Sequence, residues 1–361
     1  MAPASEKQSE NTPIAAAMLD WYDGHSRDLP WRVKGGGPVD PYRVWLSEIM
    51  LQQTTVATVK AYFEKFTRLW PTIRDLAAAP LDDVLREWAG LGYYARARNL
   101  HKCANAVVDR HGGTFPHTEA GLLTLPGVGA YTAAAIASIA FNEPASVVDG
   151  NIERVYARLT DDPTPLPKLK ERVRAAVSVD VPVDRPGDFA QSLMDLGATI
   201  CTPKRPNCLI CPIRPHCTAH STSTPETLPV KAPKKAKPIR KAVAFWLVVD
   251  DHVLLERRPE KGLLGSMVGL PVGKWEERSD FPGSNEWIED APIGGAWQKA
   301  SEIARHTFTH FHLETEILTL VRSDRPDVSA DQRDLFWLPL EKVKTAGLPT
   351  VFKKMVKLVL Q

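Results

Sequence analysis

The chain of 361 residues contains no apolar run that approaches the roughly 20 residues of a membrane-spanning helix. Its opening residues, MAPASEKQSEN, carry acidic and amide groups where a secretory or transit peptide carries basic or apolar ones. The net charge of +2 decides nothing about nucleic-acid binding, because such binding depends on where the basic residues lie. We therefore expect an intracellular protein without a membrane segment, and the length suggests roughly two domains.

Cysteine is also scarce, and four of the five cysteines lie within residues 201–217, CTPKRPNCLICPIRPHC. In a reducing compartment clustered cysteines bind metal more often than they pair, so disulfides are the weaker alternative. The spacing C-x6-C-x2-C-x5-C is formed by Cys201, Cys208, Cys211 and Cys217. Zinc knuckles usually separate two short C-x-x-C pairs by a longer loop, whereas four thiolates in one unbroken run suit a [4Fe–4S] cluster better.

The first interval of this cysteine run, TPKRPN, carries two basic residues. If the bound metal holds the interval as a loop, Lys204 and Arg205 are displayed where they can contact a phosphate backbone. The fifth cysteine, Cys103, lies on the apolar stripe of RNLHKCANAVVDRHG. That position predicts a buried structural thiol rather than a nucleophile.

The apolar pattern changes once along the chain. Residues 1–225 show helical periodicity from about residue 12, with Gly and Pro breaks between amphipathic segments. Residues 226–241 include the basic, proline-rich PVKAPKKAKPIRK, which predicts a linker. Residues 242–361 contain the β-rich runs KAVAFWLVV, HVLLERR, ETEILTLVR and DLFWLPL and end in an amphipathic helix, which predicts a separate α+β domain.

A glycine turn joins two helical segments at about residues 120–141. LPGVGAYTAAAIA places Gly127 and Gly129 directly before a helix rich in small residues. Glycines let the backbone approach a ligand closely, and the free N–H groups at the next helix start can hold a phosphate. The pattern fits a helix-hairpin-helix that grips a DNA backbone, and an ordinary helix-helix turn is the alternative.

Two carboxylates stand out as candidate catalytic groups. Asp149, in VVDGNIERVYAR, can be an ordinary N-cap, but the apolar residues before it would place it at the mouth of a buried site. Glu48, in WLSEIMLQQTT, can be an ordinary solvated residue, but its apolar neighbours leave little polar helix face around it. Burial would raise the pKa of Glu48 and keep a proton available for donation near neutral pH.

These motifs together resemble the endonuclease III superfamily of base-excision DNA glycosylases over about residues 20–220. Within that superfamily the chain is most similar to the adenine-specific branch. The motifs that carry this similarity are LPWR (29–32), SEIMLQQTTV (47–56), AGLGYYARARNL (89–100), VVDGN (147–151) and MDLGATICT (194–202). The resemblance implies a mainly α helix-hairpin-helix glycosylase domain with a [4Fe–4S] cluster loop at 201–217. It also implies removal of adenine mispaired with 8-oxoguanine or guanine in double-stranded DNA, leaving an abasic site.

The resemblance assigns roles residue by residue. Glu48 would protonate adenine, and Asp149 would stabilise or capture the oxocarbenium ion, with Tyr131 and Asn151 supporting Asp149. The remaining contacts to DNA or to the base would come from Trp31, Arg32, Gln53, Tyr93, Gly127, Gly129, Lys204 and Arg205. Among these, Gln53 and Tyr93 would wedge into the duplex while Trp31 and Arg32 line the adenine pocket. Two carboxylates are needed because adenine leaves only when protonated and the sugar cation needs a nearby anion.

The C-terminal α+β domain resembles the Nudix-like domain of the same branch. Its landmarks here are GLLGSMVGLPVGKW (262–275) and RHTFTHFHL (305–313), and the sequence contains no glutamate-rich Nudix hydrolase box. We therefore expect this domain to recognise 8-oxoguanine rather than to hydrolyse nucleotides. The recognition loop is Phe308, Thr309 and His310, where relatives commonly have serine in the middle, and threonine keeps the hydroxyl.

Two other functions compete with this interpretation. A lyase of the endonuclease III type would need a Schiff-base lysine just after the hairpin, where this chain has Tyr131 and no lysine in YTAAAIASIAF. A catalytically silent DNA-binding protein with a redox-sensing cluster would need neither Glu48 nor Asp149. We therefore expect a monofunctional glycosylase that acts as a monomer. It would be cytoplasmic and nucleoid-associated in a bacterium, or nuclear or mitochondrial in a eukaryote.

Overall fold

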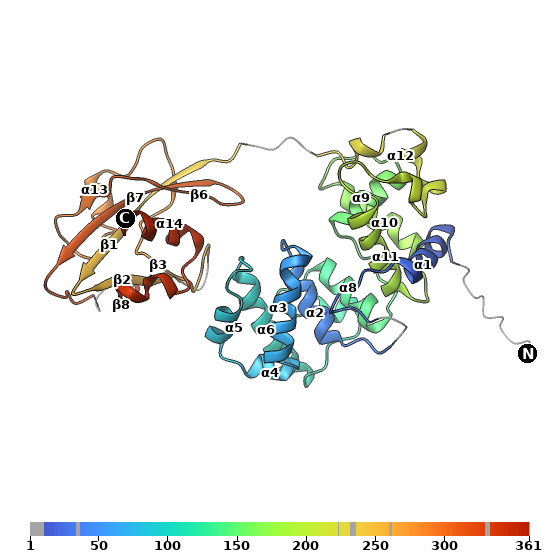
Figure 1. Ribbon diagram of the computed structural model, residues 1–361, viewed down its shortest axis with the longest axis horizontal. Coiled ribbons are helices and arrows are strands. Elements are labelled where there is room, and N and C mark those ends of the chain that lie inside the picture. Colours follow the sequence, from blue (N-terminus) through green and yellow to red (C-terminus); the bar gives the residue numbers. More distant parts are fainter. Residues whose placement is uncertain are drawn as a thin grey trace, which may run out of the picture. The chain divides into compact units, whose positions relative to one another are not determined.

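A computed structural model describes residues 11–33, 37–222, 224–231, 236–259, 262–328 and 333–360. The chain forms two compact units, Met1–Pro233 and Lys234–Gln361 (Figure 1). The first unit is helical and the second is built on a β-sheet, which confirms the predicted fold class. Residues 232–235, part of the predicted linker, lie outside the described residues.

The helical unit consists of short amphipathic helices around one core. In chain order these are α1 (Pro13–His25), α2 (Pro41–Leu51), α3 (Val56–Leu69), α4 (Ile73–Ala78), α5 (Leu81–Glu87), α6 (Ala95–His111), α7 (Glu119–Leu122), α8 (Ala130–Phe141), α9 (Gly150–Leu159), α10 (Leu169–Asp180), α11 (Pro186–Thr199) and α12 (Thr218–Ser221). Cys103 is buried in α6, as its apolar stripe predicts. Figure 1 shows α1 beside α11, so the start and end of this unit pack together.

Helix α2 runs through the middle of this core and carries Glu48. It begins with Pro41 behind Asp40, whose side chain accepts a hydrogen bond from the Tyr42 N–H. Its C-terminal carbonyls, which lack partners within the helix, accept hydrogen bonds from the buried guanidinium of Arg96 in α6. The two N···O distances, to Ile49 and Met50, are 3.1 and 2.8 Å. Arg96 therefore fixes the end of α2 from which the candidate acid projects.

The predicted helix-hairpin-helix is formed by α7, a tight turn and α8. Gly127 has a φ of +74°, and a Cβ atom there would lie 2.7 Å from the Cβ of Asn99, so only glycine fits. Gly129 is the N-cap of α8. The N–H groups at the start of α8 are therefore available to a ligand at this turn.

The second unit contains one mixed sheet. Its strands are β1 (Ile239–Val249), β2 (His252–Arg257), β3 (Val268–Gly269), β4 (Glu276–Glu277), β5 (Gln298–Lys299), β6 (Ala304–Thr307), β7 (His312–Arg322) and β8 (Asp334–Pro339). The longest pairing is parallel, between β1 and β7, from Ile239 opposite His312 to Val249 opposite Arg322. Helix α14 (Thr350–Val359) buries Phe352 and Met355 against one face of the sheet. The other face is covered by Trp297 and by Trp287, which ends the short helix α13 (Ser284–Trp287).

Strand β1 begins at Ile239, inside the segment predicted as a linker. The parallel pairing explains this start, because β7 begins at His312 and its first residues pair with the last residues of the predicted linker. Within the described residues, no helix has the length and hydropathy required to cross a bilayer.

Candidate active site

The helical unit contains a cavity of about 700 Å³ whose wall is formed by segments far apart in the sequence. These segments are the loop after α1, the end of α2 with the turn that follows it, α8, the start of α9, and α11. Seven of the predicted site residues line this cavity: Trp31, Arg32, Glu48, Gln53, Tyr131, Asp149 and Asn151. The fold therefore brings together the two candidate carboxylates, which are about 100 residues apart in the chain.

The carboxyl group of Glu48 is almost completely withdrawn from water, since the residue is 6% exposed. Burial raises the pKa of Glu48 to about 7, and the negative charge of Asp149 acts in the same direction. A hydrogen bond from Tyr131 and the positive charge of Arg32 oppose this rise without cancelling it. Glu48 can therefore carry a proton near neutral pH, as its apolar sequence neighbours suggest.

Tyr131 has a different partner from the one that the resemblance implies. Its hydroxyl donates to Glu48 Oε2 at 2.7 Å, rather than supporting Asp149 directly. Tyr131 projects from the first turn of α8, directly behind the glycine turn of the hairpin. Burial, followed by the nearby charges of Glu48 and Asp149, raises the pKa of Tyr131 well above its usual range, so the phenol remains a donor.

Asp149 is an N-cap and also a wall residue of the cavity, so the two alternatives for this residue are both realised. Its Oδ1 accepts hydrogen bonds from the backbone N–H groups of Asn151 and Ile152 at 2.9 and 2.8 Å. Its Oδ2 accepts from the Asn151 side-chain amide at 2.8 Å, as the resemblance implies. Three N–H donors and the positive end of the α9 dipole favour a negative charge at this position.

Trp31 and Arg32, from the loop after α1, both line the cavity. The Trp31 ring packs edge-on against Phe63, with 5.4 Å between ring centroids. Both terminal nitrogens of Arg32 donate to the carboxylate of Asp195 in α11, at 2.6 and 2.8 Å. The guanidinium is thus already engaged before any base enters the cavity.

The predicted wedge residues, Gln53 and Tyr93, share an unusual backbone conformation. Their φ angles are +58° and +48°, in the left-handed region that non-glycine residues seldom adopt. Gln53 lines the cavity, whereas the structure does not place Tyr93 among the residues of its wall. The Tyr93 side chain is 54% exposed, which is unusual for a large aromatic residue.

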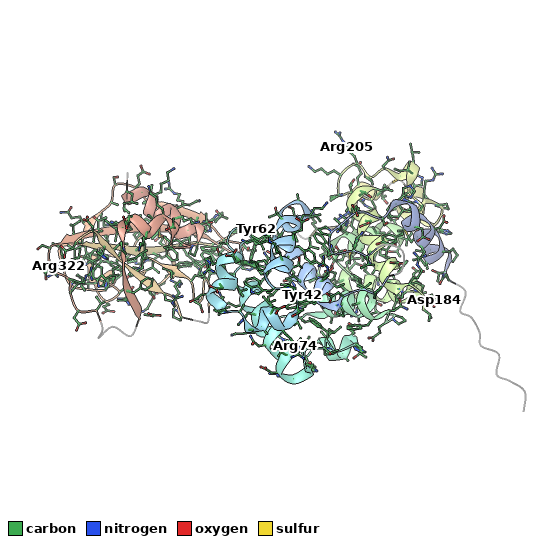
Figure 2. The ribbon with its side chains drawn as sticks, turned by 60° about the horizontal axis from the view of Figure 1, so that its bottom comes forward. Tyr42, Tyr62, Arg74, Asp184, Arg205 and Arg322 are labelled. Carbon is green, nitrogen blue, oxygen red and sulfur yellow. The ribbon has the colours of Figure 1, made fainter. Side chains whose placement is uncertain are left out.

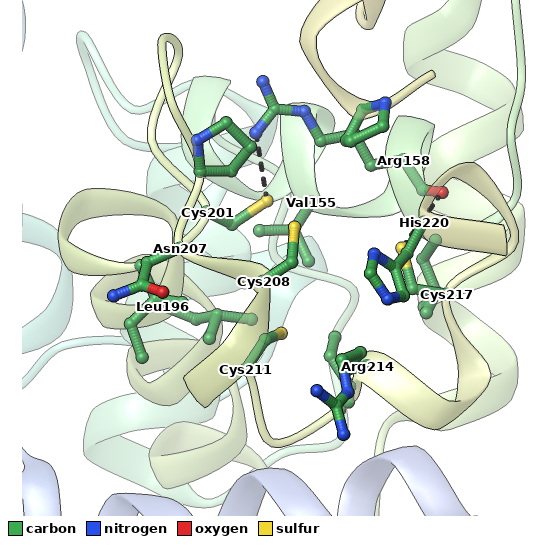
Figure 3. Close-up of a pocket in the computed structure, with 15 residues that line it drawn as sticks. Val155, Arg158, Leu196, Cys201, Asn207, Cys208, Cys211, Arg214, Cys217 and His220 are labelled. Carbon is green, nitrogen blue, oxygen red and sulfur yellow. Dashed lines mark hydrogen bonds between the residues drawn. The ribbon is translucent and has the colours of Figure 1, made fainter. Parts of the chain in front are cut away.

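The four clustered cysteines surround one small pocket after α11 (Figure 3). None of them forms a disulfide, and each is half-buried. Arg158 from α9 donates to Cys201 Sγ at 3.3 Å and to the carbonyl of Thr202 at 2.8 Å. In the part of the chain that is described, no three histidine, cysteine, aspartate or glutamate side chains are grouped closely enough to ligate one metal ion.

The first interval of the cysteine run forms an exposed loop. Lys204 and Arg205 are both exposed, and Figure 2 shows Arg205 projecting outward from its unit. The Thr202 hydroxyl donates to the carbonyl of Lys204 at 2.8 Å and stabilises the turn. The loop therefore displays two cations, as its sequence predicts.

The predicted recognition loop lies in the sheet unit, between β6 and β7. The Phe308 N–H donates to the Phe311 carbonyl at 2.9 Å and closes a tight turn. The Phe308 ring packs at 5.5 Å from the Trp275 ring, measured between centroids, and Phe311 joins the same cluster. Thr309 and His310 are exposed at the tip of the turn, where they can reach a ligand.

Sequence reasoning missed several residues that support the site. Arg154 connects Asn151 Oδ1, at 2.9 Å, to the carbonyls of Gly197 and Cys201, at 2.6 and 2.8 Å. Lys170 lines the cavity with its Nζ 3.2 Å from Glu153 Oε1. Arg27, Arg96 and Asp195 were also missed. The local sequence does not reveal their roles, because the partners that define those roles, Asp195 for Arg27 and the end of α2 for Arg96, are far away in the chain.

The fold and the cavity define a helix-hairpin-helix enzyme of DNA base excision. Residues 46–178 match the family described as HhH-GPD superfamily base excision DNA repair protein, and residues 243–358 match the NUDIX domain family. The helical unit resembles the solved structure of a thermostable thymine-DNA glycosylase, with a TM-score of 0.52 and 29% identity over 58% of this chain and 95% of that one.

Two curated relatives narrow this class. An adenine DNA glycosylase of Homo sapiens is 35% identical over 97% of this chain and 74% of the human protein. An adenine DNA glycosylase of Buchnera aphidicola subsp. Acyrthosiphon pisum is 30% identical over 94% of this chain and 95% of that protein. The chain belongs to the adenine DNA glycosylase family, and it is a DNA N-glycosylase of base excision repair.

The buried acid should make folding stability depend on pH. The pKa of Glu48 rises from 4.5 to about 7 on folding, so the native state binds the proton more tightly than the unfolded chain. The contribution of the Glu48 proton to the free energy of unfolding is therefore fully present below pH 4.5, and it is lost as pH rises through 7. Urea unfolding between pH 5 and 8 measures this effect. Toward pH 8 the free energy of unfolding of Glu48→Gln should rise relative to that of the parent by on the order of 2 kcal/mol.

A matched control is Glu64→Gln, which removes an exposed carboxylate from α3. The difference in free energy of unfolding between Glu64→Gln and the parent should stay nearly constant over the same pH range. A Glu48→Gln difference that is equally flat would show that Glu48 titrates normally in the folded protein.

Proposed function

We propose that this enzyme hydrolyses the N-glycosidic bond of adenine paired with 8-oxoguanine or guanine in duplex DNA and leaves an abasic site. The observation that carries the proposal is the pair of unlike carboxyl groups in one cavity. Glu48 is buried where a proton is retained, and Asp149 is surrounded by N–H donors that favour its anion. Pairs of this kind divide acid and anion roles between two residues.

Glu48 donates its proton to a ring nitrogen of the extruded adenine, which turns the base into a competent leaving group. Tyr131 keeps the carboxyl group oriented through its 2.7 Å hydrogen bond. As the bond breaks, positive charge develops on the sugar, and the Asp149 carboxylate stabilises it until water adds at C1′. The proton that this water loses returns to the Glu48 carboxylate, which has given its own proton to adenine. Asn151 holds Asp149 in place.

The base must leave the duplex to reach this cavity, at a cost of a few kcal/mol. Gln53 and Tyr93, both held in left-handed backbone conformations, offset that cost by filling the space in the duplex. Trp31 and Arg32 receive the adenine. The backbone is gripped by the hairpin turn at Gly127 and Gly129 and by the cationic loop with Lys204 and Arg205.

The same cavity supports a glycosylase without lyase activity. A Schiff-base nucleophile must be a neutral amine, and α8 provides none behind the hairpin. The cavity does contain Lys170, but its Nζ is engaged by Oε1 of the almost buried Glu153 at 3.2 Å. Hydrolysis rather than imine formation then ends the reaction.

We further propose that Cys201, Cys208, Cys211 and Cys217 hold a [4Fe–4S] cluster. The four side chains line one pocket as unpaired thiols, which is the donor set that such a cluster requires. In such a cluster each of the four thiolates would hold its own iron, so the set need not converge on one point as the ligands of a single ion do. When bound, the cluster would fix the shape of the loop that carries Lys204 and Arg205.

In the sheet unit, we propose that Phe308, Thr309 and His310 contact 8-oxoguanine opposite the excised base. Phe308 anchors the turn in the aromatic cluster, while the exposed Thr309 and His310 provide hydrogen-bonding groups. The threonine hydroxyl can make the contact that serine makes in relatives.

Loss of either carboxylate should stop the chemistry without preventing binding. Glu48→Gln cannot donate a proton, and Asp149→Asn cannot stabilise the sugar cation. Single-turnover excision from an adenine:8-oxoguanine duplex should fall by roughly a hundredfold or more in each variant, while the affinity for the duplex changes little. The parent should cleave the strand only after added alkali, and borohydride should trap little of it on DNA.

Parental rates in either variant, or efficient trapping of the parent by borohydride, would contradict these assignments. Glu64→Gln serves again as the control, because it removes an equivalent charge outside the cavity.

Metal content should test the cysteine assignment. The purified protein should be yellow-brown and contain about four iron atoms per chain. Cys208→Ser should lower the iron content, destabilise the loop and weaken DNA binding, whereas Cys103→Ser, which changes the buried thiol of α6, should retain the iron. A colourless, fully active protein that contains zinc would overturn the assignment.

The recognition loop should control the choice of the opposite base. Replacing the exposed pair Thr309 and His310 by alanine should reduce the ratio of excision rates opposite 8-oxoguanine and guanine by roughly tenfold, about the value of one good hydrogen-bonded contact. Phe308→Ala should act similarly but also lower stability. His252→Ala, on the β1–β2 turn of the same unit, should leave the ratio unchanged. An unchanged ratio in the double alanine variant would refute this role.

A further inference from the structure

Asp195 is a fully buried carboxylate on α11 that the proposed reaction does not use, with an exposed fraction of 0%. It accepts four hydrogen bonds, two from Arg27 and two from Arg32. The backbone N–H and Nε of Arg27 lie 3.0 and 2.6 Å from its oxygens, and the Arg32 nitrogens lie 2.6 and 2.8 Å away. The Arg32 hydrogen bonds and charge, with help from Arg27, hold the pKa of Asp195 below its usual range in spite of burial.

Arg32 is placed between two possible anionic partners. Its guanidinium is itself almost buried and lies on the wall of the cavity that contains Glu48. Three groups face the Glu48 carboxyl: Tyr131 from α8, Asp149 from the start of α9, and Arg32 from the loop after α1. Only Arg32 among them favours loss of the Glu48 proton by its charge.

The hydrogen-bond geometry shows that Arg32 binds Asp195 rather than Glu48. A guanidinium forks onto a carboxylate through two parallel N–H···O bonds, and Asp195 receives both terminal nitrogens of Arg32 in this way. A guanidinium engaged by Asp195 offers little to Glu48. The two hydrogen-bonded arginines, Arg27 and Arg32, thus face a carboxylate other than Glu48.

We propose that Asp195 is a positioning residue for catalysis: it holds Arg32 away from Glu48 and cancels its charge, so that Glu48 keeps the proton that it donates to adenine. This inference rests on the proposed role of Glu48 as the acid. Asparagine at position 195 has one acceptor oxygen and an amide that repels the guanidinium donors. The charge of Arg32 would then act on Glu48 with less compensation, and it would favour loss of the Glu48 proton.

The test is the pH dependence of single-turnover excision at saturating enzyme. Activity requires protonated Glu48, so it should decline as pH rises through the pKa of Glu48. Asp195→Asn should move that decline to lower pH by roughly one unit, and the double variant Asp195→Asn with Arg32→Gln should return it toward the parental pH. Asp188→Asn is the matched control, because Asp188 lies on the same helix and pairs with Arg185 at 2.8 Å outside the cavity.

A purely structural role for Asp195 would lower the rate equally at every pH, and this result would overturn the inference. If Asp195→Asn does not fold, Arg27→Gln provides a second test, because it removes one of the two cations that pair with Asp195. That variant should move the decline to higher pH by roughly 0.3 units, since the wall becomes more negative. A decline that stays in place or moves to lower pH in Arg27→Gln would contradict the proposal.

A direct titration separates this inference from the proposed function. The 13C carboxyl resonance that disappears in Glu48→Gln reports the Glu48 proton without any reaction. If this resonance titrates at lower pH in Asp195→Asn, the inference holds even if the rate follows another group. The other outcome is a parental rate that does not decline with pH, while the Glu48 resonance still titrates at lower pH in Asp195→Asn. In that case Glu48 is not the acid, but the effect of Asp195 and Arg32 on its proton is confirmed.

Discussion

The retention of a proton on a buried carboxyl group is the constraint on which the rest of this structure depends. A glutamate that is 6% exposed ionises when a cation pairs with it, and an ionised Glu48 could not act as the proposed acid. Here burial and the charge of Asp149 raise the pKa of Glu48 to about 7, while the nearest guanidinium is bound to another carboxylate. The core around α2 is therefore arranged for acidity at Glu48, at a cost in stability.

The second carboxylate illustrates how one local interaction can serve folding and chemistry together. Asp149 caps α9 with its side chain and faces the cavity with its charge. Arg154 then connects the first turn of that helix to the end of α11 and to the carbonyl of Cys201. A disturbance of the cysteine run can thus reach Asp149 through two residues, Arg154 and Asn151, without crossing the hydrophobic core.

Local sequence signals predicted most of the fold but only part of the site. Apolar periodicity and glycine turns identify α8 and its hairpin, and β-rich runs identify β1, β2, β7 and β8, because those patterns depend on neighbours in the chain. The partner of Tyr131 could not be predicted, since Glu48 and Asp149 are both far away in sequence. Asp195 was missed because it sits in MDLGATICT as one acidic residue of a helix, and only its two arginine partners reveal its role.

In the sheet unit, residues distant in the sequence also support the proposed recognition loop. The last residues of the basic segment enter β1 and pair with the start of β7, the strand that follows the loop. Lys237 Nζ donates to the Phe308 carbonyl at 3.0 Å, and the Arg240 guanidinium lies 4.5 Å from the centroid of the Phe311 ring. Basic residues that composition assigns to a solvated linker therefore hold the turn that displays Thr309 and His310. The parallel pairing consequently sets the boundary between linker and domain, and moving that boundary past Arg240 would remove both supports of the loop.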